Sequence, residues 1–264
     1  MKPVKAAPID PAALAARFAQ AGTRAGFRVE TMGSAAGVPL LALTRRTSGP
    51  RPRIYLSAGI HGDEPAPPHA LLRLLETGVF DARATWFVCP LLNPAGFVGG
   101  TREGPLAIDL NRDYLAPRSL EIQAHTAWLA RQPPFDLALC LHEDWEATGF
   151  YLYELNAAGQ PTLAPAILAA AGATCPIDLA DLIDGRAAQG GLIRPLLDPA
   201  ARPDWPEALY LRAHHTSLTY TLESASRLPL EERVATLVAA VQAAVKALTV
   251  APRKTPPNPG AAAL

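Results

Sequence analysis

Two side chains that can bind a metal follow one apolar run of this sequence. In "LSAGIHGDEPA" (56–66) the small and apolar residues stop at His61, and Glu64 follows three positions later. A His-x-x-Glu pair on a turn after a strand can supply two ligands to one metal. The same residues would also suit a polar turn, in which Asp63 caps a helix that begins near Pro65.

His142 is the candidate for a third ligand. It ends the apolar run "FDLALCLH" (135–142), as His61 follows the run "RIYLSAGI" (53–60). Hydrolytic zinc sites usually take three protein ligands and leave a fourth position for water. We therefore predict that His61, Glu64 and His142 bind a metal, whereas the other four histidines are expected to be solvated or satisfied in the core.

Two further clusters of polar residues lie beside apolar runs. In "TSLTYTLES" (216–224) the alternation places Glu223 on the face opposite to the apolar residues. The segment "AIDLNRD" (107–113) gathers two aspartates, an asparagine and an arginine around a single leucine. Such a density of charge next to apolar runs indicates a polar site.

The elements that would position these groups follow from the pattern of apolar residues. Nearly continuous apolar runs at 53–60, 84–92 and 135–142 are typical of strands that are covered on both faces. Helical patterns at 65–78 and 119–132 separate them. This alternation predicts an α/β protein with three α/β/α layers and a mixed, largely parallel central sheet, whose functional groups lie at the carboxyl ends of the strands.

The two ends of the chain complete the expected domain. The first helix should begin at Pro11, with Asp10 as its N-cap, and run to about Ala21, where Gly22 ends it. Further helices are expected at 162–172 and 228–248, and a short meander at 28–33 and 39–46. We expect one catalytic domain over residues 1–250, followed by a proline-rich, disordered tail at 251–264.

The composition argues against several classes of partner. Lysine plus arginine equals aspartate plus glutamate, 24 each, so neither nucleic acid nor an anionic membrane is expected to bind. The N-terminus has no apolar run of the kind found in signal peptides, and the chain has no window of about 18 uncharged apolar residues. We therefore expect a cytoplasmic protein. Three scattered cysteines are too few for a disulfide framework and are expected to be buried free thiols.

Six short motifs occur in an order that is similar to one family of enzymes. They are "GIHGDE" (59–64), "LLNPAG" (91–96), "GTR" (100–102), "IDLNRD" (108–113), "LCLHED" (139–144) and "YTLES" (220–224). The chain resembles the zinc metallocarboxypeptidases of the carboxypeptidase A type, and most of all their short bacterial members such as murein peptide amidases. This resemblance implies a zinc carboxypeptidase-like fold, one Zn²⁺ per chain and murein-derived peptides as candidate substrates.

The resemblance also implies a role for each matching residue around the metal. His61, Glu64 and His142 match the zinc ligands. Asp109 matches the aspartate that orients the first histidine, and Arg102 matches the arginine that polarises the scissile carbonyl.

The substrate-binding residues are carried over in the same way. Asn111 and Arg112 match the pair that binds a terminal carboxylate, although Arg112 could instead form an internal salt bridge with a neighbouring aspartate. Glu223 corresponds to the general base, because a carboxylate near a zinc-bound water can take its proton. Tyr210 is the nearest candidate for a tyrosine that caps the substrate. The sequence departs from the family pattern at Ala95, where an aspartate is usual, and in "NRDY", where "NRNF" is usual.

Three functions compete on this evidence. The first is a zinc-dependent hydrolase that cleaves a peptide or a peptide-like amide next to a free carboxylate. The runner-up is a deacylase of the succinylglutamate desuccinylase/aspartoacylase type, which acts on acyl amino acids and has similar motifs. Such deacylases often carry a further C-terminal β domain, whereas only a helix and a short tail follow Glu223, which favours the peptidase. A non-catalytic binding module should lack a ligand or the base, and this chain has both.

Overall fold

The computed structural model describes residues 9–195 and 202–250, and in these residues eight strands form one mixed sheet. The strand order is β1-β2-β4-β3-β5-β10-β6-β9. The four strands β4, β3, β5 and β10 at the centre run parallel to one another, whereas β1, β2 and β6 pair in antiparallel fashion with their inner neighbours. The predicted mixed, largely parallel sheet between helices is confirmed.

The strands of this sheet are β1 (Arg28–Ala35), β2 (Val38–Arg45), β3 (Arg53–Ser57), β4 (Thr85–Cys89), β5 (Leu137–Asp144), β6 (Tyr151–Asn156), β9 (Leu192–Ile193) and β10 (Leu218–Ala225). A separate hairpin consists of β7 (Leu182–Ile183) and β8 (Arg186–Ala187). The helices are α1 (Pro11–Arg24), α2 (Ala66–Glu76), α3 (Pro94–Gly99), α4 (Leu120–Leu129), α5 (Ala164–Gly172), α6 (Glu207–His214) and α7 (Leu230–Val250). Two 3₁₀ turns, η1 (Pro105–Ala107) and η2 (Leu110–Arg112), lie in the segment between α3 and α4.

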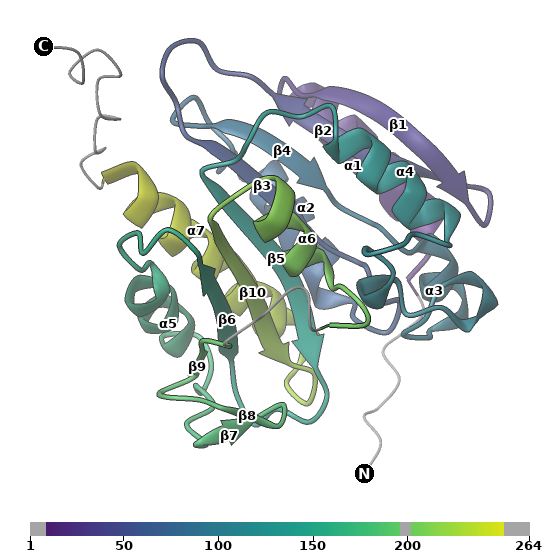
Figure 1. The fold of residues 1–264 in the computed structure, drawn as a ribbon. Coiled ribbons are helices and arrows are strands. Elements are labelled where there is room, and N and C mark those ends of the chain that lie inside the picture. Colours follow the sequence, from purple (N-terminus) through teal and green to yellow (C-terminus); the bar gives the residue numbers. More distant parts are fainter. Residues whose placement is uncertain (1–8, 196–201, 251–264) are drawn as a thin grey trace, which may run out of the picture.

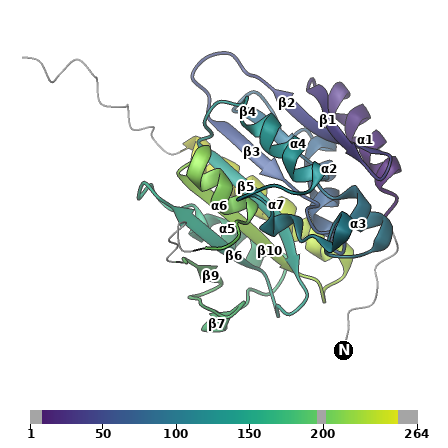
Figure 2. The ribbon, with the colours of Figure 1, turned by 45° about the vertical axis from the view of Figure 1, so that its right-hand side comes forward.

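Helices cover both faces of the sheet (Figures 1 and 2). On one face α1, α2, α5 and α7 share an apolar core with the leucines at 137, 139 and 141 of β5, and on the other face residues of α4 and α6 share a second core with Ala138 and Cys140. Strand β5 is thus apolar on both sides, as the continuous apolar run predicted. Helix α7 is long and apolar enough to cross a membrane by length and composition, but its buried residues pack against α2, α5 and β10.

The structure corrects some of the expected boundaries. Asp10 is the N-cap of α1, as predicted, but this helix does not end at Gly22. It continues to Arg24. Gly22 does not end the helix but allows it to pack closely on the sheet, since a Cβ there would lie 2.7 Å from Cδ2 of Leu43 on β2. The predicted tail at 251–264 lies outside the described residues.

Candidate metal centre and substrate pocket

The predicted ligands come together at the carboxyl ends of the central strands. His61 follows β3 by a short connection, Glu64 lies just before α2, and His142 lies near the end of β5. Glu223 of β10 is directly opposite His142 in the parallel register. Residues that are far apart in the sequence therefore meet at one edge of the sheet, as the topology of parallel strands requires.

His61, Glu64 and His142 form a cluster that can hold a metal ion, here called the metal centre. The Nδ1 atom of His61 lies 2.5 Å from Oε1 of Glu64, and Nδ1 of His142 lies 3.1 Å from Oε2 of the same carboxylate. One potential ligand atom from each residue lies within 4.8 Å of the others, and all three side chains are buried. Two imidazoles and a carboxylate are a donor set that suits a divalent metal such as zinc.

The electrostatics of the metal centre reflect this shared carboxylate. Burial alone would lower the pKa of His61, but Glu64 and Asp109 outweigh it and raise the pKa to about 9. Burial alone would raise the pKa of Glu64, but the two histidines lower it far below its usual range. The centre therefore holds a carboxylate anion that favours the protonated form of His61.

Asp109 and Arg102 flank the metal centre. Oδ1 of Asp109 lies 3.3 Å from Nε2 of His61, on the ring edge opposite to the ligand atom Nδ1. Such a contact fixes the orientation of a metal-binding imidazole. Arg102 donates from Nε to Asp109 at 3.1 Å, and its Nη1 lies 3.7 Å from Glu64. Both residues therefore lie beside the potential metal ligands.

Asn93 connects the ligand turn to Arg102, a role that the sequence motif did not reveal. This fully buried side chain donates from Nδ2 to the carbonyl oxygens of Ile60, next to His61, and of Arg102, at 3.1 and 3.2 Å. The turn also packs closely, because a Cβ at Gly62 would lie 2.0 Å from the main chain of Gly96. The "NPAG" motif thus supports the turn that carries His61.

The alternative explanation of the turn, a helix cap at Asp63, is wrong. The N-cap of α2 is Pro65, no side-chain cap occurs there, and Asp63 is exposed. The N–H of Ala66, the first residue of the helix, instead donates to the carboxylate of Glu143 on β5. The turn therefore places two potential ligands while its helix is capped from another strand.

A pocket of about 320 Å³ opens beside the metal centre and contains most of the predicted substrate-binding residues. Glu64, His142, Arg102, Asn111, Arg112 and Glu223 all line it. Oδ1 of Asn111 accepts a hydrogen bond from the N–H of Glu207 at 2.9 Å, which leaves the Nδ2 donors of Asn111 for the pocket. Arg112 forms no ion pair with Asp109 or Asp113 within the described part of the chain and bonds only to the carbonyl of Asn111.

Glu223 lies on the pocket wall as a carboxyl group with a raised pKa. Burial and the charges of Glu64 and Asp144 raise its pKa to about 8, although His142 opposes the shift. A carboxyl group of this kind can exchange protons near neutral pH. Its position across from His142 and its pKa both suit a general base.

Tyr210 is not among the residues that line the pocket. Its ring packs against Tyr114 and His214, with centroid distances of 5.5 and 4.6 Å. The tyrosines of the pocket are Tyr151 and Tyr153 on β6, a strand that we did not predict. The alternating pattern of "FYLYEL" (150–155) was the signal for it.

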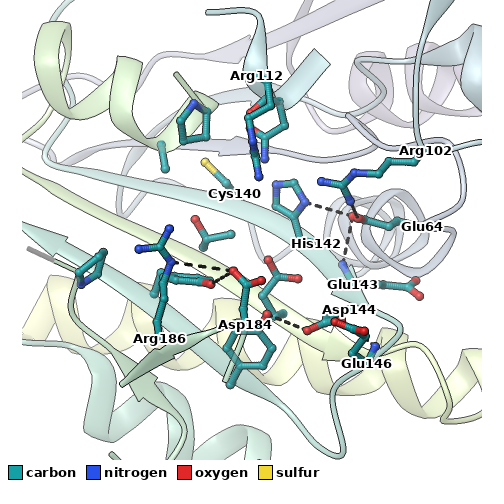
Figure 3. A pocket seen from close by; sticks show the side chains of 18 of the residues that line it. Glu64, Arg102, Arg112, Cys140, His142, Glu143, Asp144, Glu146, Asp184 and Arg186 are labelled. Atoms are coloured by element: carbon teal, nitrogen blue, oxygen red, sulfur yellow. Dashed lines mark hydrogen bonds and ion pairs between the residues drawn. The ribbon is translucent and has the colours of Figure 1, made fainter. Parts of the chain in front are cut away.

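Charged residues line both sides of this pocket (Figure 3). In the figure, Arg112 lies on the opposite side of His142 from Asp144 and Glu146. The β7–β8 hairpin adds Asp184 and Arg186 to the lining of the pocket, and the hydroxyl of Tyr153 donates to Asp184. Sequence analysis did not identify the hairpin because its strands have only two residues each.

The sequence matches one family model, that of the succinylglutamate desuccinylase/aspartoacylase catalytic domain, over residues 50–184. This range contains the three potential ligands together with Arg102, Asp109, Asn111 and Arg112, but it ends before Glu223. No curated protein matches the chain significantly.

Solved structures with the same fold include peptidases. A candidate metallopeptidase from Shewanella amazonensis is similar at 26% identity and a TM-score of 0.79, over 89% of this chain and 92% of that one. A metallo-carboxypeptidase from Burkholderia cenocepacia (20% identity, TM-score 0.66, 89% and 68% of the chains) shares the fold. So does the carboxypeptidase A of Helicoverpa armigera (14%, 0.58, 89% and 71%). The predicted carboxypeptidase-like fold is confirmed.

Proposed function

We propose that this chain, which belongs to the succinylglutamate desuccinylase/aspartoacylase catalytic-domain family, is a zinc-dependent hydrolase of an amide bond next to a free carboxylate. One observation carries the proposal: the His61, Glu64 and His142 side chains converge beside a pocket that is lined by Arg102, Arg112 and Glu223. A metal, a fixed cation and a carboxyl group of raised pKa are the parts that amide hydrolysis needs.

Each residue around the metal centre has a distinct task in this proposal. Zinc held by His61, Glu64 and His142 would polarise the substrate carbonyl and lower the pKa of water. Glu223 would take a proton at its carboxylate and later deliver it to the leaving amine. The guanidinium of Arg102, which stays protonated, would stabilise the negative charge that develops on the carbonyl oxygen.

The leaving part of the substrate would carry the free carboxylate. The planar guanidinium of Arg112 can bind both carboxylate oxygens, and Asn111, whose Nδ2 donors are not used in its bond to Glu207, lines the same pocket. This arrangement serves a peptide with a free C-terminus and an acyl amino acid equally well. The carboxylate end therefore defines the class of reaction but does not separate the two classes of substrate.

The acyl side of the pocket favours a peptide. Asp144 and Glu146 lie on the side of His142 that is opposite to Arg112, so the acyl part would extend toward these acids (Figure 3). A succinyl group would bring a second carboxylate against them, and like charges repel. An amino group there would be attracted instead. Murein-derived peptides are therefore the first substrates that we would test, and acyl amino acids are the second candidates, supported by the family model.

Metal content is the first test of the proposal. Elemental analysis of the purified protein should find about one zinc per chain, and the His61→Ala variant should lose it. The zinc-loaded protein should then release a C-terminal amino acid or dipeptide from peptides faster than it deacylates succinyl and acetyl amino acids. If neither protein binds zinc after reconstitution, the proposal is wrong. Faster deacylation would replace the peptidase by the deacylase.

A further inference from the structure

Glu143 follows the ligand His142 and connects three elements around the metal centre. Its side chain is fully buried, and its Oε2 accepts hydrogen bonds from Arg233 of α7 and from Ser226 at 3.1 Å. The main-chain N–H of Glu143 donates to Oε2 of the ligand Glu64 at 3.1 Å. One residue thus touches a metal ligand with its main chain and a distant helix with its side chain.

The start of α2 explains why this carboxylate is needed. The first N–H groups of a helix have no partner within the helix and require an acceptor from elsewhere. In α2 the second and third residues are Pro67 and Pro68, which have no N–H, so Ala66 carries the donor that must be satisfied. Oε1 of Glu143 accepts from this N–H at 2.5 Å. A carboxylate at a helix N-terminus is also favoured by the helix dipole.

Arg233 makes this arrangement possible inside the protein. Burying a carboxylate without a partner is strongly unfavourable, and a cation in direct contact offsets much of that cost. The side chain of Arg233 is only 8% exposed, and its Nη1 bonds directly to Oε2 of Glu143. Helix α7 therefore supplies a cationic partner for the carboxylate that holds the start of α2.

We propose that the Glu143–Arg233 pair positions the metal ligands: it fixes Glu64, just before α2, against His142, near the end of β5. Glu143 is a positioning residue because it acts through Glu64 and Ala66 and need not touch the metal. The inference rests on the proposed metal-dependent function. It extends that function to a buried acid that directly follows the ligand His142.

Two double variants separate positioning from simple stabilisation. Glu143→Leu with Arg233→Met removes the buried pair without leaving an unpaired charge, so the fold should persist while Ala66 loses its acceptor. Glu143→Gln with Arg233→Met keeps a side-chain oxygen for the Ala66 N–H. Zinc affinity of the full chain, measured by competition with a chromophoric chelator, should fall by roughly 10–100-fold in the first variant. It should stay within about threefold of the wild type in the second.

Glu154→Gln is the matched control. Glu154 is another buried glutamate of the same sheet, with Arg194 and Tyr220 as partners, and it contacts no ligand of the metal centre. This variant should lose stability in denaturant unfolding but keep the zinc affinity of the wild type. Circular dichroism would confirm that each protein is folded during the titration.

The outcomes distinguish this inference from the proposed function. If the wild type binds zinc and both double variants bind it equally well, the pair is merely structural and the inference is wrong. If the Glu143→Leu variant does not fold, Glu143→Asp takes its place, because it keeps the charge for Arg233 but is too short to reach Ala66 as well. Unchanged zinc affinity in that variant would equally overturn the inference. A wild type that binds no zinc would refute the proposed function together with this extension of it.

Discussion

The metal centre and a second buried cluster on the same face of the sheet are built from similar residue types but behave differently. The second cluster, here called the polar network, consists of Tyr55, Tyr114, His125 and Glu207. In the metal centre two imidazole nitrogens point at one carboxylate, and the pKa of His61 is raised to about 9. In the polar network burial lowers the pKa of His125 to about 3, so this imidazole is neutral.

The hydrogen bonds of the polar network have one consistent direction. Tyr55 donates its hydroxyl proton to Glu207 at 2.7 Å, so it must accept from Nε2–H of His125 at 2.9 Å. The neutral ring then accepts at Nδ1 from the hydroxyl of Tyr114 at 2.8 Å. Every donor in this series of hydrogen bonds has an acceptor. Both ring nitrogens of His125 are therefore in use, and neither is left to bind a metal.

The comparison shows that histidines and a glutamate in proximity do not by themselves make a metal site. A metal site needs lone pairs that point at one common position. In a structural network each lone pair instead accepts a hydrogen bond from a different donor. The polar network instead holds the first residue of α6, whose N–H orients Asn111. The two clusters thus serve one pocket in different ways, and the following predictions test that difference.

The largest expected effect is on metal binding. His142→Ala should reduce the zinc content from about one per chain to almost none, because one of three protein ligands is lost. His125→Gln should keep the full zinc content, since among the described residues the ring of His125 bonds to Tyr55 and Tyr114 and to none of the potential ligands. Elemental analysis of both variants checks the comparison. Equal loss of zinc in the two would mean that the clusters are not separate.

Glu223→Gln should separate metal binding from turnover. We expect the rate of amide hydrolysis to fall by about 10²–10⁴-fold, because the amide cannot accept the proton. Zinc content should not change, since Glu223 is not among the three ligands. Steady-state kinetics with the best peptide substrate would measure the loss. Retained turnover would remove Glu223 from the mechanism.

His125→Phe should affect stability rather than chemistry. The substitution leaves the buried hydroxyls of Tyr55 and Tyr114 each without one partner, which should lower the free energy of unfolding by about 2–4 kcal/mol. Adding Tyr114→Phe should recover part of this loss because it removes one of the unpaired groups. Urea denaturation of the three proteins provides the measurement. A single variant as stable as the wild type would contradict the role of the network.

The smallest effect is a difference in how the free energy of unfolding depends on pH. Because the pKa of His125 is about 3 in the folded protein and 6.5 ordinarily, the unfolded chain binds a proton between these values that the folded protein does not. The stability that neutral His125 contributes is therefore complete above pH 6.5 and is lost as the pH falls toward 3, by up to about 1.4 kcal/mol per pH unit. Unfolding of the metal-free wild type between pH 6.5 and 4.5 should show this slope, and His125→Phe should lack it. If the free energy of unfolding changed with pH in the same way in both proteins, the low pKa of His125 would be contradicted.

The sequence by itself determined the parts of this protein that depend on local pattern. Continuous apolar runs identified the parallel strands, and Asp10 identified the start of α1. The motifs marked His61, Glu64, His142 and Glu223 as candidate site residues, and these lie close together in the structure. These features are readable because hydrophobic burial and capping act over a few residues and leave a regular trace in the sequence.

Only the tertiary structure decided which side chains share one point in space. Tyr151 of β6 lines the pocket whereas Tyr210 lies outside its lining, and Glu143 caps a helix that begins 77 residues earlier. His125 and His142 look alike in sequence, since both lie in apolar segments. Their hydrogen-bond partners come from elements far along the chain, so long-range packing alone makes one a structural residue and the other a candidate metal ligand.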